Sequence, residues 1–202
     1  MKPTDMLMHE HRIIEQVLDC LEKMVERCEE GGDLNREHAE QSIAFFRTFA
    51  DRCHHGKEED RFFPLAHERG IPREGGPIGQ MLLEHTQGRA AIKKMDEAIP
   101  NASAGDPVAL EGFLEGAREY IVLLRAHIQK EDQCLFPMAD HVLSPADQEN
   151  LMASFEEAEL TLHEPGTHEK FLEIANHLAD YYGVPQASVG SVGSCFHHTH
   201  AA

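Results

Sequence analysis

The stretch HHGKEEDRFFP at residues 54–64 decides how this chain folds, because a second version of it, HIQKEDQCLFP, occupies residues 127–137. Each version contains His-x-x-x-Glu, with His54 before Glu58 and His127 before Glu131. Residues four apart lie on one face of a helix, one turn above the other. Each stretch therefore offers an imidazole and a carboxylate side by side, a ligand pair that suits a transition metal.

A lone His precedes each of these stretches and extends the repeat. His11 follows Glu10, and His85 follows Glu84. The offset from His11 to His85 is 74 residues, and the offset from His54 to His127 is 73. A near-constant offset of this kind indicates an internal duplication. The alternative, surface helices with incidental histidines, does not explain the matching tails, so we expect a metal site built from both halves of the chain.

Composition places the chain among globular proteins. It has 202 residues, of which 41% are hydrophobic, and it lacks Trp, so its core should be mainly aliphatic. No apolar run approaches the roughly 18 residues of a membrane span. The first residues, MKPTDMLMHEHR, lack the apolar stretch of a secretory signal. We therefore expect a cytoplasmic protein without a membrane partner.

Charge and cysteine usage narrow the class further. The formal net charge is −18 with His neutral, which argues against nucleic acid as a partner because phosphates would be repelled. The five Cys residues show no C-x-x-C spacing, which fits a reducing cytosol better than a disulfide framework. Cys53 and Cys134 lie beside the two motifs, but inert packing is the favoured interpretation over a redox role.

The apolar pattern is helical almost throughout and predicts an all-α fold. Four long helices are expected at residues 4–28, 35–69, 77–98 and 107–142, with a kink or break near Pro64. Short loops between them favour an up-down four-helix bundle with antiparallel neighbours. Two shorter helices are expected at residues 145–160 and 167–182. The predicted organisation is a bundle at residues 1–142, accessory helices at 143–183 and a flexible tail at 184–202.

The inward line of the fourth helix contains the clearest candidate ligands. Successive residues of this line are three or four positions apart, as on the buried face of a helix in a bundle. A charged residue at such a position is costly unless it is paired or bound to metal, so Glu131 is informative here. The line consists of Leu110, Phe113, Ala117, Tyr120, Leu124, His127, Glu131, Cys134 and Met138.

The inward polar residues are numerous enough to bind two metal ions rather than one. A tetrahedral zinc takes four ligands, whereas this chain offers four imidazoles and two carboxylates. Two ions, each with two terminal His and both bridged by the two Glu, would use all six. Imidazole with carboxylate favours iron, manganese or zinc over calcium or magnesium. The candidate ligands are His11, His54, Glu58, His85, His127 and Glu131.

With their apolar-Phe-Pro tails, the motifs make residues 4–142 resemble the hemerythrin-like proteins, which carry the HHE cation-binding domain. The resemblance implies a four-helix bundle around two iron ions with an oxo or hydroxo bridge, with manganese and zinc ranked behind iron. It also implies bridging roles for Glu58 and Glu131.

One departure from oxygen-carrying hemerythrins concerns the third helix, where those proteins have His-x-x-x-His. Here Met81 lies four residues before His85 and Arg89 four after it, so a fifth His is missing. His55 is expected to be peripheral, because Ile128 stands at its position in the second repeat. A missing ligand should open a coordination position, which weakens the case for simple reversible oxygen carriage.

Two further groups of residues stay open to interpretation. Glu59 and Asp132 follow the ligand Glu in the two repeats and are expected at the surface or behind the ligands. Tyr120 could hydrogen-bond a bound ligand or a bridge, although a core role is favoured. Near the C-terminus, incidental metal affinity is favoured over metal delivery for Cys195, His197, His198 and His200.

Three functions compete at this point. The first is a di-iron sensor, store or stress-response protein that binds oxygen or nitric oxide. The second is a di-iron oxidase or reductase that acts on nitric oxide, oxygen or peroxide, with an electron donor as a further partner. The third is a structural bundle that holds zinc or iron. A homodimer is compatible with all three.

Overall fold

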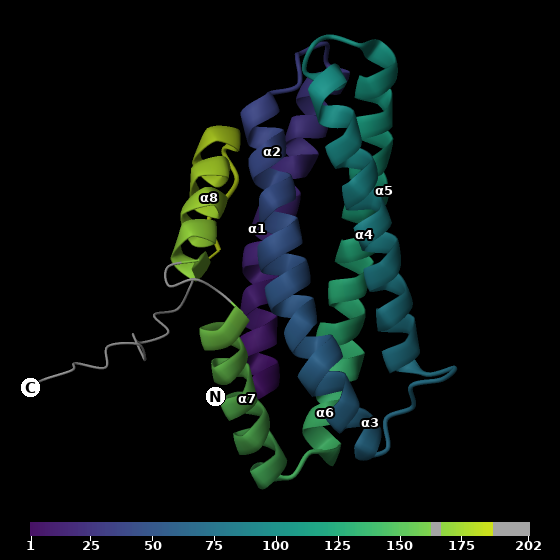
Figure 1. Ribbon diagram of the computed structural model, residues 1–202, viewed down its shortest axis with the longest axis vertical. Coiled ribbons are helices and arrows are strands. Elements are labelled where there is room, and N and C mark those ends of the chain that lie inside the picture. The colour runs from purple at the N-terminus through teal and green to yellow at the C-terminus, as the bar shows by residue number, and fades with distance from the viewer. Residues whose placement is uncertain (163–166, 188–202) are drawn as a thin grey trace, which may run out of the picture.

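The computed structural model describes residues 1–162 and 167–187, and this part of the chain is helical with no β-strand. Four antiparallel legs form the bundle, as predicted (Figure 1). The first leg is α1 (Pro3–Glu29), and the third is α4 (Pro77–Ala102). The second runs from α2 (Arg36–Phe45) to α3 (Phe63–Glu68), and the fourth from α5 (Pro107–Lys130) to α6 (Phe136–Val142).

The second and fourth legs begin where their sequences favour a helix start. The side chain of Asn35 accepts a hydrogen bond from the backbone N–H of His38 at 3.0 Å, and so caps α2. Asp106 caps α5 in the same way through Val108 and Ala109, with Pro107 at the first helical position. These caps place the starts of the second and fourth legs within a residue or two of the sequence prediction.

The second and fourth legs, which carry the His-x-x-x-Glu motifs, contain π-helical turns around these motifs. These are η1 (Phe46–His55) and η2 (Glu58–Phe62) in the second leg, and η3 (Glu131–Leu135) in the fourth. A π turn bonds i to i+5 and thus adds one residue per turn relative to an α-helix. The side chains after such a turn rotate relative to the pattern that a continuous α-helix would give.

That rotation corrects the inward line predicted for the end of the fourth leg. Cys134 and Met138 were expected to face inward, but both are exposed. Leu135 and Ala139, one residue later in each case, are buried instead. The added residue in η3 shifts the inward register by one, and this also leaves the Cys134 thiol outside the core.

The core has two apolar layers, and the polar candidates lie between them. One layer lies toward the α1 C-terminal end and includes Leu18, Phe46 and Leu124. The other lies toward α3 and α6 and includes Phe62 and Phe136. This arrangement surrounds the ligands with closely packed side chains and holds them in a low-dielectric interior.

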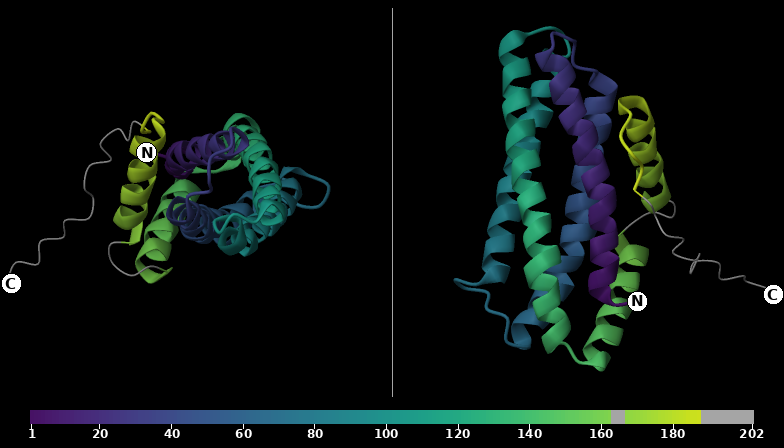
Figure 2. Two further views of the ribbon diagram at one scale, coloured as in Figure 1. Left: turned by 90° about the horizontal axis from the view of Figure 1, so that it is seen from above. Right: turned by 180° about the vertical axis from the view of Figure 1, so that it is seen from behind.

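Two further helices lie outside the bundle on the side of α1, as the view from above shows (Figure 2). α7 (Pro145–Leu162) packs against α1 and η2, and α8 (Thr167–Tyr182) packs against α1 and α2. Residues 184–187, expected to begin a flexible tail, are held to the bundle: Val184 is buried, and the Ala187 N–H donates to Gln16 at 2.6 Å.

The cluster of Cys195, His197, His198 and His200 lies outside the described residues. Within the described part, the helices include none with the length and apolar character needed to cross a membrane.

Candidate metal centre

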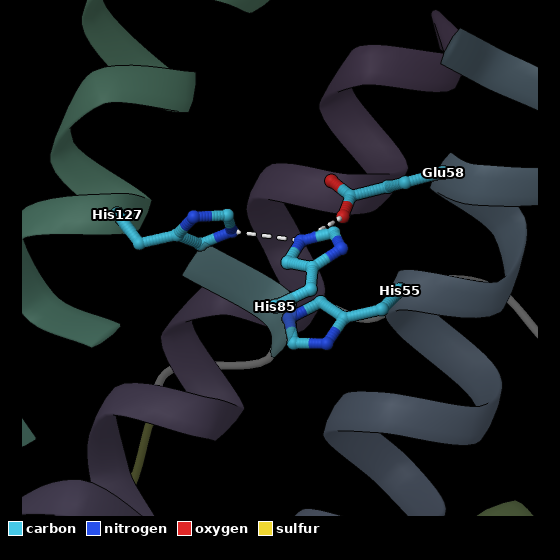
Figure 3. A group of neighbouring side chains, drawn as sticks. All are labelled: His55, Glu58, His85 and His127. Atoms are coloured by element: carbon cyan, nitrogen blue, oxygen red, sulfur yellow. Dashed lines mark hydrogen bonds and ion pairs between the residues drawn. The ribbon is translucent and has the colours of Figure 1, made fainter. Parts of the chain in front are cut away.

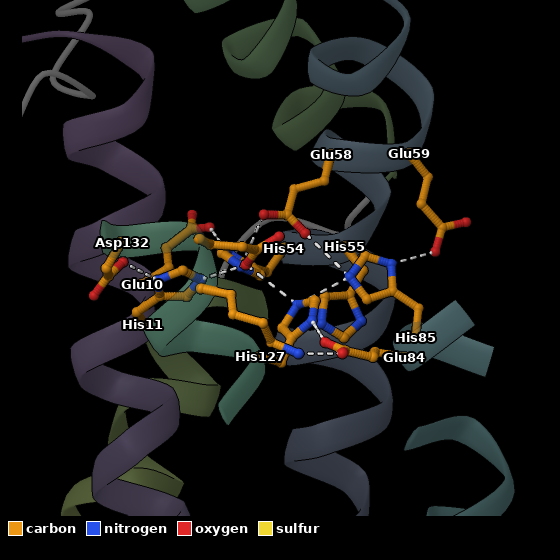
Figure 4. Close-up of polar contacts among 12 residues, drawn as sticks. Glu10, His11, His54, His55, Glu58, Glu59, Glu84, His85, His127 and Asp132 are labelled. Carbon is orange, nitrogen blue, oxygen red and sulfur yellow. Dashed lines mark hydrogen bonds and ion pairs between the residues drawn. The ribbon is translucent and has the colours of Figure 1, made fainter. Parts of the chain in front are cut away.

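The six residues predicted as ligands converge at the middle of the bundle, where all six side chains are buried. The first leg supplies His11, and the third supplies His85. Each π-containing leg supplies one His-x-x-x-Glu pair. The close-up shows His11, His54, Glu58, His85 and His127 drawn together from separate legs (Figure 4). The structure thus brings equivalent residues of the duplicated halves together at the middle of the bundle.

Their donor atoms form two adjacent groups. The first, called the two-His cluster, contains His11, His54, Glu58 and Glu131, with one potential ligand atom from each lying within 4.8 Å of the others. In it, the Nε2 atom of His11 lies 3.3 Å from Glu131, and the Nε2 atom of His54 lies 3.5 Å from Glu58. The donor set matches the one expected for each metal ion.

The second group, called the three-His cluster, contains His55, Glu58, His85 and His127, again within 4.8 Å of one another (Figure 3). The Nε2 atoms of His85 and His127 lie 3.1 Å apart and face each other. Two ring nitrogens at this distance require a shared proton or a cation beside them, because two lone pairs repel.

His55 corrects the sequence interpretation, which placed it at the periphery. Its side chain is buried, and its ring stacks on that of His85 with centroids 3.8 Å apart. The π turn η1 explains the position, because its wider turn lets consecutive residues both reach the interior. The site therefore contains five histidines, and the fifth comes from the second leg rather than from the third.

Two carboxylates connect the clusters. The two oxygens of Glu58 diverge: Oε1 faces His54 at 3.5 Å, and Oε2 faces His85 at 3.4 Å. A single oxygen of Glu131, Oε2, lies 3.3 Å from His11 and 3.2 Å from His127. Both side chains therefore reach both clusters, which is the placement that bridging carboxylates need.

A carboxylate behind each ring fixes the orientation of the imidazoles. Because an ionised carboxylate only accepts hydrogen bonds, the Nδ1–H of each ring is the donor, and Nε2 is left to face the centre. Such partners orient a ligating His and raise its basicity. The pairs are His11 with Asp132 (2.7 Å), His54 with Glu10 (2.8 Å), His85 with Glu59 (2.7 Å), His127 with Glu84 (3.0 Å) and His55 with Asp51 (3.3 Å).

A cationic side chain lies behind each of the four shorter pairs. Lys57 and Lys130, which occupy the same position in the two repeats, contact Glu10 and Glu84 respectively. Arg12 contacts Asp132, and Arg89 contacts Glu59 at 2.6 Å. The duplication therefore extends to the groups behind the ligands, with two lysine-backed and two arginine-backed carboxylates.

The histidines differ in protonation. Burial lowers the pKa of His127, but Glu131, Glu84 and Glu58 outweigh it and raise the pKa to about 10. Burial also opposes protonation of His11, yet Asp132 and Glu131 raise its pKa to about 9. The pKa of His55 is instead well below its usual range, first through burial and then through His85.

Unpaired donor atoms test whether metal ions fit this site. Within the described residues, the Nε2 atoms of His11 and His54 and all four carboxylate oxygens of Glu58 and Glu131 are buried without a hydrogen-bond partner. Buried polar atoms are rarely left unpaired, because each costs about 1–3 kcal/mol. Imidazole nitrogens and carboxylate oxygens converging in this way are the donors that a transition metal takes. The residues therefore fit a pair of cations.

The sequence pattern did not identify Glu10 and Glu84 as partners of the histidines, although they are the residues directly before His11 and His85. Each supports a ligand on another leg: Glu10 pairs with His54, and Glu84 pairs with His127. Glu10 and Glu84 are separated by the same offset as His11 and His85, and each has apolar residues on either side on its helix. This repetition is the sequence signal that could have identified them.

Comparison with known proteins agrees with this geometry. The family model of the hemerythrin HHE cation-binding domain matches residues 2–139. Uncharacterized protein Rv1995 of Mycobacterium tuberculosis is 23% identical over 153 residues, which are 76% of this chain and 59% of that protein. Uncharacterized protein Mb2018 of Mycobacterium bovis matches with the same figures.

This chain thus spans about three fifths of the length of the curated relatives it matches. No solved structure matches it significantly. Because the family model covers well over half of the chain and its motifs supply the converging donors, the chain belongs to the hemerythrin family of HHE cation-binding domains, which are metal-binding helical bundles.

Proposed function

We propose that this protein holds two iron ions in the two clusters and uses them to bind, or react with, a small diatomic molecule such as oxygen or nitric oxide, or peroxide. The observation that carries the proposal is the set of buried, unpaired donor atoms on His11, His54, Glu58 and Glu131. Iron bound there would supply redox chemistry and a coordination position for a small ligand. The residues themselves provide imidazole nitrogens, which are neutral once a metal ion displaces their protons, and two shared carboxylates.

The ligand count of the proposed centre differs from the sequence expectation. Five histidines and two carboxylates replace four and two, because His55 joins the second cluster. The missing fifth His therefore no longer supports an additional open coordination position. The two-His cluster has one imidazole fewer than its neighbour, so it is the cluster where we place the position left for solvent or a small ligand.

A sensor, store or stress-response role is favoured by the attached helices. α8 packs against α1 and α2, which lead to the residues that hold the centre. A change in ligand positions could thus be transmitted to α8. The second candidate is an oxidoreductase with turnover. The burial of the centre and the charged groups behind its histidines favour this candidate, and such an enzyme would require an electron donor. A structural zinc or iron site is the third.

The test begins with metal quantification and an optical spectrum of protein from iron-supplied cells. The proposal expects two iron ions per chain and absorption bands of an iron centre. The reduced protein is then mixed rapidly with oxygen. A reversible spectral change supports binding, whereas repeated oxidation with consumption of a donor supports the oxidoreductase. Zinc, or a content far below two ions per chain, contradicts the iron proposal.

A further inference from the structure

The helix α8 lies on the outside of the bundle, where it packs against α1 and α2 (Figure 2). Its apolar face joins a core layer of the bundle, and the ring of Phe171 meets that of Phe45 on α2 edge to face, with centroids 6.2 Å apart. The buried amide of Gln16 on α1 donates to Asn176 at 3.3 Å and accepts from the N–H of Ala187 at 2.6 Å. These contacts dock α8 and the residues after it on the bundle.

A buried histidine lies in this interface. His38 on α2 is 5% exposed, and its Nδ1 atom lies 3.2 Å from the hydroxyl of Tyr182 on α8. Its ring is nearly perpendicular to that of Tyr181, with centroids 4.2 Å apart, and to that of Tyr182, with centroids 5.5 Å apart. The imidazole therefore contacts α8 through two aromatic side chains, which help to keep it from water.

The hydrogen bond to Tyr182 fits a neutral imidazole. Burial raises the pKa of Tyr182 to about 12, so its hydroxyl keeps its proton and donates. A neutral ring with its proton on Nε2 accepts at Nδ1, whereas a protonated ring has an N–H on both nitrogens and accepts at neither. Cys20 and Cys28 of α1 lie near the same hydroxyl and add no charge, because burial raises the pKa of both thiols.

Basic side chains of α1 and α8 lie around the same aromatic pair. The guanidinium of Arg27 on α1 is placed over both rings, 5.0 Å from the centre of Tyr181 and 4.7 Å from that of Tyr182. The ring of His177, an exposed residue of α8, lies 5.7 Å from that of His38. A proton on His38 would therefore bury a cation against side chains that already pack against another cation.

The balance of the surrounding groups keeps His38 neutral. Burial lowers its pKa most, and His177 and Arg27 lower it further, whereas Glu37, its neighbour on α2, raises it. Stability that depends on a lowered histidine pKa is complete above the usual value of about 6.5 and is lost as pH falls through the folded-state value. The docked position of α8 should therefore become less stable on mild acidification.

We propose that α8 is a pH-sensitive latch, which stays docked on α1 and α2 while His38 is neutral and detaches when this ring takes up a proton. Detachment uncovers Phe45 on α2 and frees Gln16, which lies five residues after His11 on the same helix. The inference does not depend on the proposed iron chemistry, because His38 and the groups around it belong to neither cluster.

The test measures hydrogen–deuterium exchange of the iron-loaded full-length protein at pH values of about 7.5 and about 5.5, on either side of the usual histidine value. Rates are corrected for the intrinsic effect of pH on exchange, and peptides from α8 are compared with peptides from α5 in the same sample. Protection of α8 should fall by roughly threefold or more relative to α5 at the lower pH, because the proton favours the detached state. No fall in α8, or an equal fall in α5, would overturn the proposal.

Two variants assign the effect to His38. His38→Gln keeps a side chain that can accept from Tyr182 but takes up no proton in this range, so the fall in protection should disappear. A guanidinium stays charged throughout the range, so Arg27→Gln can alter the fall only through a group that titrates, and the fall should become smaller. His141→Gln, the same change at an exposed site on α6, is the matched control and should show the wild-type fall.

A fall of wild-type size in His38→Gln would show that another group controls α8 and would overturn the proposal. If His38→Gln has already lost the protection of α8 at the higher pH, Arg27→Gln decides the matter. An undiminished fall in Arg27→Gln would then contradict the latch, and a reduced fall would support it.

Discussion

Glu58 belongs to both clusters, and Glu131 lies close to a histidine of each, but the two clusters differ in their histidines. His54 and His127 occupy equivalent repeat positions, and so do His11 and His85, which gives each cluster two rings. The next position breaks the symmetry: it is His55 in one repeat and Ile128 in the other, and Ile128 belongs to the apolar core. The repeats therefore give the two clusters equivalent histidines, and the single difference between His55 and Ile128 makes the clusters chemically unequal.

The groups behind the rings show the same contrast. Four rings are backed by a carboxylate at 2.7 to 3.0 Å, and all five carboxylates, Asp51 included, contact a Lys or Arg. His55 has the longest link, 3.3 Å to Asp51. The fifth ring is thus the least firmly oriented, which leads us to expect that it contributes less to metal binding than the other four.

The largest effect should come from the carboxylate that both clusters share. Glu58→Gln keeps the size of the side chain but removes its charge and one of its two oxygen donors. We expect both clusters to lose metal, with a loss of affinity beyond the roughly 100-fold seen when a group behind a ligand is removed. The measurement is metal per chain by mass spectrometry after dialysis. Glu156→Gln, at an exposed site, is the control.

The second-largest effect should be a difference in metal content between variants of His54 and His55, which are neighbours on the second leg. His54→Asn leaves the two-His cluster with one ring, so we expect that cluster to lose its ion and metal content to fall by about half. His55→Asn leaves two rings in its cluster, the number expected from the repeats, and should retain both ions with weaker binding. Titration with a competing chelator measures both. Equal losses in the two variants would contradict the asymmetry of the clusters.

A smaller difference is expected for two aspartates behind the rings. Asp132→Asn removes the charge 2.7 Å from His11, and Asp51→Asn removes the charge 3.3 Å from His55. Both aspartates are partly exposed and contact an Arg, so the variants are matched. We expect a loss of metal affinity of about 10- to 100-fold for Asp132→Asn and a smaller loss for Asp51→Asn. A larger loss for Asp51→Asn would show that His55 is held as firmly as the others.

The smallest effect should be the dependence of the stability of the metal-free protein on pH. The folded-state pKa values of His11 and His127, about 9 and about 10, lie above the usual value of about 6.5. The resulting stabilisation is complete below pH 6.5 and is lost as pH rises through 9 and 10. Urea unfolding of the metal-free protein should therefore show stability falling over that range. The metal-loaded protein, whose rings must be neutral, should not show this fall.

A flat stability profile of the metal-free protein between pH 6.5 and 10 would contradict that assignment. His55 provides an internal comparison, because its pKa is lowered and its ring is neutral throughout the range. The variant His127→Gln should reduce the pH-dependent loss, whereas His55→Gln should leave the loss unchanged.

Much of this protein follows from its sequence alone. Apolar spacing predicted each helical leg, and the starts of α4 and α5 match at Pro77 and Pro107. The duplicated His-x-x-x-Glu motifs and the His at the same offset predicted that six side chains would meet. These features depend on local periodicity, because residues three or four apart on a helix necessarily share a face.

Tertiary structure alone decided the rest. The π turns changed the register, so that His55 faces inward while Cys134 faces outward, and a pattern that assumes one α-helical period cannot reveal such a change. The pairing of Glu10 with His54 joins residues 44 positions apart, on separate legs. Helix periodicity fixes which face a residue occupies, but contacts between helices depend on how those faces pack, and only the assembled bundle determines them.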